Sequence, residues 1–231
     1  MKINYKLFKG TFVSRPNRFI ALINVDGEIH RSHLADPGRL NELLIPGAKL
    51  LVAKASEGSK RKTKYSTMMV YAGSELVSLV TTLPNYFVKE SLINGGIPLL
   101  EKYKLIKSEV TLGRHRIDFL LKDSLEKDFY LEVKSVTYVK NNVAKFPDAV
   151  TLRGRKHLDL LNNIIVSGGR AGVLFVCQRT DAKFFEPMWD RDKLFCKSLL
   201  KAKNNGLKIW CISVKITNTD ITFYREMEVN L

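Results

Sequence analysis

Residues 116–136 read RIDFLLKDSLEKDFYLEVKSV, and this stretch decides the fold of the larger part of the chain. Two apolar runs, 110–121 and 129–136, are rich in β-branched and aromatic residues. Asp123 and Asp128 lie in the polar segment between the runs and are typical of a hairpin. The stretch therefore predicts two neighbouring strands.

The sequence after this pair alternates between helical and strand patterns. We expect a helix over 148–166 and a second over 190–204 that stops at Gly206, with strands over 171–177 and 207–216. Strands that alternate with helices are typical of parallel strands joined by crossovers. Before them, Pro84 and the Asn94-Gly95-Gly96 stop predict one more helix. Residues 84–231 are thus expected to form an α/β domain.

The first 83 residues show a different pattern. From Leu7 onward the chain reads as five or six short strands, with a hairpin signal at Asp26-Gly27 and one short helix over 39–44. This pattern suits a small barrel of the oligonucleotide-binding (OB) type. We therefore predict a mixed α/β protein with a barrel over 1–83 and an α/β domain over 84–231.

The charge balance favours a polyanionic partner. Lys and Arg number 38 against 23 Asp and Glu, a formal charge of +15, which attracts nucleic acid first and an anionic membrane second. The alternative is that the basic composition reflects host proteome bias or a structural role of the ribosomal kind. Three cysteines without CxxC spacing fit a reducing compartment, and no segment has signal-peptide or membrane-span character. We expect a cytoplasmic protein that does not bind membranes.

Asp118, Glu132 and Lys134 are the candidate catalytic residues. Alternate side chains of a strand share a face, so Glu132 and Lys134 point the same way, and Asp118 joins them if the strands are adjacent. The two carboxylates could hold Mg²⁺ or Mn²⁺ with help from the Val133 carbonyl, and Lys134 would position water or phosphate. The alternative is that these are ordinary strand-end acids, paired with basic neighbours. Glu90 is a candidate third metal ligand, or a solvated helical acid.

Basic residues that could contact nucleic acid lie in both parts of the chain. A helix over 148–166 places Arg153 and His157 on one face, and the Gly154 between them allows close approach of a phosphate backbone. The basic loop 59–65 lies between two barrel strands. Solvated basic faces are the alternative for both. The candidate nucleic-acid contacts are Arg18, Lys60, Arg61, Lys62, Lys64, Arg116, Arg153, Lys156 and His157.

Several of these motifs together resemble a known family. The run FPDAVTLRGRKHL at 146–158 is very specific, and RIDF at 116–119 and EVKSVT at 132–137 accompany it. On these motifs the chain resembles the sugar fermentation stimulation protein A family along nearly its whole length. Where many members have Asn-Thr-Gly, this chain has Asp36-Pro37-Gly38, which leaves any role of that turn in doubt.

The resemblance implies an OB-like barrel followed by a domain similar to the PD-(D/E)xK nucleases, in a family described as DNA-binding and linked to sugar metabolism. It places Asp118, Glu132 and Lys134 on the nuclease-type motif and Glu90 on a helix that often carries another acid.

Three hypotheses about function follow. The first is a DNA-binding protein with a magnesium-dependent nuclease-like site; the second is a non-catalytic DNA-binding regulator of sugar metabolism genes; the third is an RNA-binding module. Since no helix-turn-helix or zinc-finger pattern is present, we expect weak sequence specificity. A homodimer is expected if both strands of a duplex are cut, because that usually takes two sites.

Overall fold

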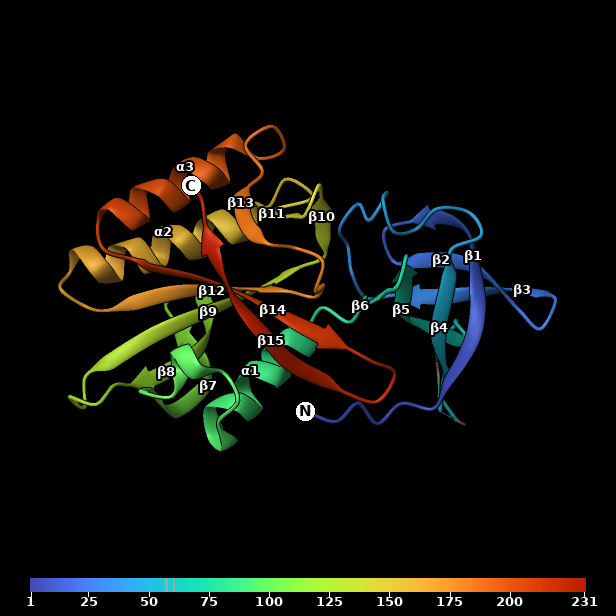
Figure 1. The fold of residues 1–231 in the computed structure, drawn as a ribbon, viewed down its shortest axis with the longest axis horizontal. Helices are drawn as coiled ribbons and strands as arrows, with labels where there is room; N and C mark the ends of the chain where they lie inside the picture. Colours follow the sequence, from blue (N-terminus) through green and yellow to red (C-terminus); the bar gives the residue numbers. More distant parts are fainter. Residues whose placement is uncertain (57, 60) are drawn as a thin grey trace. The chain divides into compact units, whose positions relative to one another are not determined.

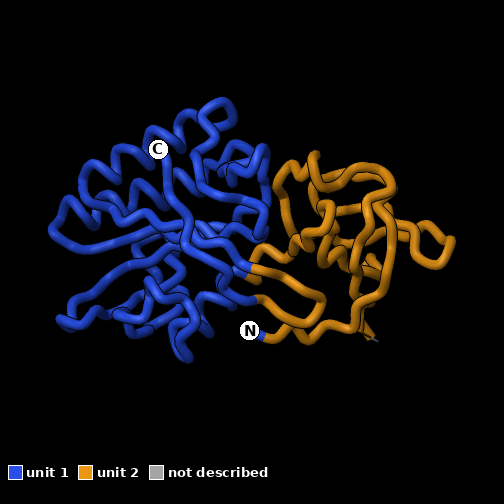
Figure 2. The backbone as a smooth tube through the Cα atoms, in the orientation of Figure 1, with its two compact units in different colours: residues 1, 84–214, 222–231 blue, residues 2–83, 215–221 orange. Residues whose placement is uncertain are grey.

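The chain folds into two compact units, shown in different colours in Figure 2. The computed structural model describes residues 1–56, 58–59 and 61–231. One unit holds Lys2–Leu83 with Lys215–Ile221, and the other holds Met1, Pro84–Val214 and Thr222–Leu231. In the first unit the Ile3 N–H donates to the Thr219 carbonyl at 2.7 Å. This contact ties the hairpin tip 215–221 to the start of the chain, which the sequence did not predict.

The N-terminal unit is a closed barrel (Figure 1). Antiparallel pairs join β1 to β2 and β4, β2 to β3, and β4 to β5, and a parallel pair between β3 and β5 closes the ring. This is the five-stranded OB arrangement that the sequence predicts. A sixth strand extends it beside β5. The strands are β1 Leu7–Asn17, β2 Ile20–Val25, β3 Glu28–Leu34, β4 Lys49–Lys54, β5 Tyr65–Ala72 and β6 Glu75–Ser78.

The barrel core follows the alternation of its strands. In β2, every second side chain from Ala21 to Val25 is buried. The expected hairpin after it is confirmed, because Asp26 and Gly27 take positive φ values of 53° and 87°. The predicted helix over 39–44 is wrong. Leu40 has a φ of 52°, which breaks helical geometry, and residues 41–43 form a turn.

The C-terminal unit contains a nine-stranded sheet in the order β10-β11-β13-β15-β14-β12-β9-β8-β7. Its central strands β9, β12 and β14 are parallel and are connected through α2 and α3, which confirms the predicted crossovers. The elements are α1 Leu83–Asn94, the 3₁₀ helix η1 Pro98–Leu100, β7 Lys104–Leu112, β8 His115–Lys122, β9 Asp128–Val136, β10 Tyr138–Lys140, β11 Val143–Phe146, α2 Leu152–Val166, β12 Ala171–Cys177, β13 Phe184–Pro187, α3 Lys193–Asn204, β14 Lys208–Ile216 and β15 Ile221–Val229.

Three predicted boundaries in this unit are corrected. The run 110–121 is not one strand, since Gly113 with a φ of 60° turns the chain and divides it into β7 and β8. Helix α2 begins at Leu152 instead of 148 because Thr151 caps it, and α3 begins at Lys193 instead of 190 because Asp192 caps it. The short strands β10, β11, β13 and the strand β15 were not predicted.

Helices α2 and α3 lie side by side over the sheet (Figure 1), and their apolar side chains complete the core of this unit. Leu158 and Leu161 of α2 and Phe195 of α3 join Phe175 and Phe185 in one buried cluster. Among the residues that the structure describes, no helix has the length and apolar character needed to span a membrane.

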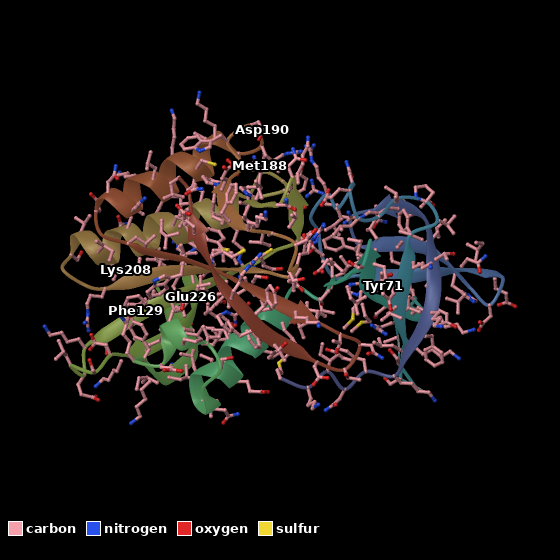
Figure 3. The ribbon with its side chains drawn as sticks, in the orientation of Figure 1. Tyr71, Phe129, Met188, Asp190, Lys208 and Glu226 are labelled. Atoms are coloured by element: carbon pink, nitrogen blue, oxygen red, sulfur yellow. The ribbon has the colours of Figure 1, made fainter. Side chains whose placement is uncertain are left out.

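Gly172 in β12 marks a close approach at one end of the sheet, where Phe129 and Lys208 also lie (Figure 3). A Cβ atom at this position would lie 2.9 Å from Phe129 Cζ and 3.0 Å from Trp210 Cζ3. These two rings stack on each other with centroids 5.7 Å apart. The glycine therefore provides the space in which the two rings pack.

We predict that Gly172→Ala lowers the free energy of unfolding by about 1–3 kcal/mol, because the added methyl group overpacks this contact. Urea unfolding checks the change, with Thr222→Ala at an exposed strand position as the control. Equal stability of Gly172→Ala and the wild type would contradict the packing argument.

Candidate active site

The candidate site forms where β8, β9 and α2 meet, and Glu132 of β9 is at its centre. Glu132 is only 2% exposed. Its Oε1 atom accepts hydrogen bonds from Lys134 Nζ and from His157 Nδ1 of α2. Its Oε2 atom is buried and has no hydrogen-bond partner among the described residues. One oxygen of this carboxylate is thus held in place and the other remains able to bind a ligand.

Asp118 of β8 is the second carboxylate of the site. Its Oδ2 atom accepts a hydrogen bond of 2.7 Å from the Val133 N–H, which confirms that the two predicted strands bring Asp118 beside the Glu132 segment. Burial, followed by the nearby Glu132 charge, raises the pKa of Asp118 to about 7. Asp118 therefore gains a proton easily near neutral pH unless a cation neutralises the pair.

Glu132 remains ionised in the same surroundings. Burial alone would raise its pKa, but the Lys134 ammonium and the His157 hydrogen bond outweigh burial and hold the pKa below its ordinary value. The pKa values of the two carboxylates are thus shifted in opposite directions, upward for Asp118 and downward for Glu132. Divergent pKa values in a pair of neighbouring acids are typical of functional sites.

The start of α2 is fixed by a network that the sequence did not reveal. Asp192 is buried and accepts two hydrogen bonds, from the Thr151 N–H at 2.8 Å and from the Phe195 N–H at 3.0 Å. Thr151 Oγ1 in turn accepts from the Gly154 N–H at 3.0 Å. Asp192 thereby caps α3 and anchors the residue that caps α2, which sets the position of His157.

Gly154 is explained by packing inside the protein. A Cβ atom there would lie 2.8 Å from Thr151 Oγ1 and 3.3 Å from Phe195 Cε2. The interpretation of Gly154 as a point of phosphate approach is therefore wrong: Thr151 and Phe195 fill the space. His157 is only 4% exposed, and its side chain contacts Glu132 instead of lying on an open basic face.

Glu90 does not join the two carboxylates. It lies on the exposed side of α1, and its carboxylate is 3.2 Å from the Met1 amino group. Among the described residues there is no group of three His, Cys, Asp or Glu side chains arranged to hold a metal ion. A metal at this site would accordingly be held by two protein carboxylates.

A pocket of about 540 Å³ adjoins His157. It contains three of the predicted nucleic-acid contacts besides His157, of which Arg116 forms an ion pair of 2.6 Å with Glu109. Sequence reasoning missed Arg114 and His115. The signal that could have found them is their position directly after the Gly113 turn. The lining residues are Arg114, His115, Arg116, Leu152, Arg153, Lys156 and His157.

The predicted basic contacts of the barrel are exposed wherever the structure describes them. They are Arg18, Arg61, Lys62 and Lys64. Arg61 Nη1 donates to Ser66 Oγ at 3.0 Å, and the Lys64 ammonium lies 5.8 Å from the centre of the Tyr65 ring. Lys60 lies outside the described residues. The barrel thus presents exposed cations near the start of β5.

The donor set at Asp118 and Glu132 fits a hard divalent cation. Both residues offer carboxylate oxygens, and Glu132 Oε2 is a buried oxygen without a partner. Mg²⁺ is commonly bound through one or two carboxylates, with water and substrate phosphate completing its coordination. The raised pKa of Asp118 has the same implication, because a cation between the two charges removes their repulsion.

Comparison with known proteins assigns both units. The family description "Sugar fermentation stimulation protein RE domain" matches residues 82–220, and "SfsA N-terminal OB domain" matches residues 13–79. The chain belongs to the SfsA family. An SfsA homologue from Chloroflexus aurantiacus is 42% identical over 223 residues, covering 96% of this chain and 85% of that protein. One from Clostridium tetani is 38% identical over the full length of both.

A solved SfsA structure has the same fold. SfsA from Pyrococcus furiosus, determined in complex with Ca²⁺, superposes with a TM-score of 0.89 at 26% sequence identity, and the match covers 100% of this chain and 98% of that one. The two-part architecture, an OB barrel and a mixed α/β domain, is therefore that of the SfsA family.

We predict that Asp118→Asn stabilises the metal-free protein at pH 8 more than at pH 5. The ordinary pKa of 3.8 rises to about 7 on folding, so the energetic cost of the buried charge is absent below pH 3.8 and complete above pH 7. Removing that charge should raise the free energy of unfolding at pH 8 by about 1–4 kcal/mol. Urea unfolding in EDTA at both pH values measures it.

Asp159→Asn, an exposed acid of α2, is the control for this experiment and should change stability little at either pH. If Asp118→Asn shifts the unfolding free energy equally at pH 5 and pH 8, the Asp118 charge carries no cost in the fold.

Proposed function

We propose that this SfsA protein binds DNA and hydrolyses phosphodiester bonds with a divalent metal held by Asp118 and Glu132. The observation that carries the proposal is the Glu132 carboxylate, buried with one oxygen held by Lys134 and His157 and the other without a partner. The Ca²⁺ in the Pyrococcus furiosus SfsA structure supports a divalent site, and the charge of +15 supports a nucleic-acid substrate.

Asp118 and Glu132 would hold Mg²⁺ or Mn²⁺, with the Val133 carbonyl as a further candidate ligand. Such an ion, when bound, lowers the pKa of a water ligand and neutralises charge that develops at phosphorus. Glu90 is not part of the proposed set, because its carboxylate meets the Met1 amino group. The side chains proposed to hold the metal are therefore those of Asp118 and Glu132.

Lys134 contributes a compact positive charge beside the carboxylates. Its side chain is only 14% exposed and its ammonium contacts Glu132 Oε1, so it is held within the site. An ammonium so placed can bind a phosphate oxygen and stabilise the negative charge of the transition state. Removing it should slow cleavage while DNA remains bound through other basic residues.

His157 acts on Glu132. Its Nδ1 atom contacts the carboxylate oxygen that Lys134 also contacts, and its burial keeps the ring in one orientation. We assign it the role of a positioning residue, which turns Glu132 Oε2 away from α2 and toward the ligand.

DNA contact is assigned to exposed basic residues of each unit. In the barrel these are Arg18, Arg61, Lys62 and Lys64, and in the C-terminal unit Arg116, Arg153 and Lys156. These side chains suit phosphate groups, which are the same in every sequence, so recognition is expected to have weak sequence specificity.

Cleavage of single-stranded, duplex and branched DNA in Mg²⁺ tests this function. We predict that Asp118→Asn and Glu132→Gln each lower the cleavage rate by at least about 100-fold, because each removes a metal ligand, and that Lys134→Met lowers it by about 10–1,000-fold. DNA affinity measured in EDTA should change less than about threefold. Asp159→Asn is the control variant.

Two other outcomes would redirect the proposal. Tight DNA binding by the wild type without cleavage of any substrate would favour a regulator whose acidic pair is structural. Preference for RNA over a DNA strand of the same sequence, at the same salt concentration, would favour an RNA-binding module.

Salt dependence tests the electrostatic part separately. We predict that the logarithm of the DNA association constant falls steeply with the logarithm of salt concentration, and that combined Arg61→Ala, Lys62→Ala and Lys64→Ala flattens this slope by about 1–3, because fewer counterions are released. Lys197→Ala, at an exposed position of α3, is the single-charge control. A wild-type slope near zero would show that phosphate contacts do not drive binding.

A further inference from the structure

The pocket beside His157 is formed by two segments of the C-terminal unit that lie far apart in the sequence. The β7–β8 turn and the start of β8 supply Arg114, His115 and Arg116, and the first two turns of α2 supply the remaining lining residues. The pocket therefore lies at a helix N-terminus, next to the side chain that contacts Glu132.

The charge of this pocket is largely uncompensated. Arg116 forms an ion pair of 2.6 Å with Glu109. Within the part of the chain that the structure describes, no carboxylate forms an ion pair with Arg114, Arg153 or Lys156. Three positive charges are thus gathered around one cavity without a paired carboxylate, and such a cluster attracts anionic ligands.

The pocket is also larger than a phosphate group needs. A volume of about 540 Å³ is in the range of sites that take small organic ligands. Leu152, which is 53% exposed, supplies an apolar wall. His115 lies with its ring centroid 6.2 Å from that of His157 and offers an aromatic face. A nucleotide has matching parts, because its phosphate suits the cations and its base and sugar suit the other two side chains.

We propose that this pocket binds the terminal nucleotide of a nucleic-acid strand through its phosphomonoester group. An internal phosphodiester carries one negative charge, whereas a terminal phosphate carries between one and two at neutral pH and exposes three oxygens. Arg114, Arg153 and Lys156 offer more positive charge and more donors than one diester uses. The pocket thus selects a phosphorylated strand end.

This inference rests on the proposed function for its meaning, because a phosphorylated end held beside Glu132 would make strand ends the preferred substrate class. Its test does not depend on cleavage. The affinity for a phosphorylated end is measured in EDTA, where no hydrolysis occurs, and cleavage of the same strands is measured separately in Mg²⁺.

The experiment compares single-stranded DNA 12-mers of one sequence that carry a 5′-phosphate, a 3′-phosphate or hydroxyl groups at both ends. Fluorescence anisotropy with wild-type protein should show about tenfold tighter binding of one phosphorylated strand than of the unphosphorylated strand, as charge-assisted hydrogen bonds to the extra phosphate provide. In Arg153→Ala and in Arg114→Ala this preference should fall below about threefold. Lys197→Ala should retain it.

Equal affinity of wild-type protein for all three strands would overturn the inference, as would a preference that survives both Arg153→Ala and Arg114→Ala. Both variants change exposed side chains, so folding is not at risk. Cleavage in Mg²⁺ without any end preference would leave the proposed function standing and the pocket assignment refuted. An end preference without cleavage of any strand would support the pocket assignment and refute the hydrolytic part of the proposed function.

Discussion

The Glu132 carboxylate lies buried where β9 meets α2, and the arrangement of the C-terminal unit depends on how its charge is compensated. A charged group so deep in the protein is stable only with partners, and breaking such an arrangement typically costs about 3–5 kcal/mol. Lys134 comes from the same strand and His157 from the helix above it. The contact therefore fixes both the chemistry of the carboxylate and the register of α2 on the sheet.

Asp192 holds the N-terminal end of α2. This buried acid joins the N-terminal caps of α2 and α3, and Gly154 lets the first turn of α2 pack against Thr151 and Phe195. Two buried acids thus anchor one helix, Asp192 at its start and Glu132 one to two turns later. These anchors position the pocket residues that α2 supplies, Arg153 and Lys156 among them.

The two carboxylates of the site are not equivalent, although both are acids on adjacent strands. Asp118 has a raised pKa because burial and Glu132 disfavour its charge, whereas Glu132 has a lowered pKa because the Lys134 ammonium and the His157 hydrogen bond outweigh its burial. A divalent cation would satisfy both, since it neutralises Asp118 and binds the unpartnered oxygen of Glu132.

The sequence by itself determined the barrel, the parallel crossovers and the Asp118, Glu132 and Lys134 constellation, because alternation of side chains along a strand is a local property. It misjudged the starts of α2 and α3 and the segment 39–44, where caps and a positive φ at Leu40 decide the boundaries. Only the tertiary structure brought His157 onto Glu132 and gathered Arg114 and His115 with the α2 residues. These contacts join residues that are distant in sequence, and their pairing follows from packing, which no local pattern encodes.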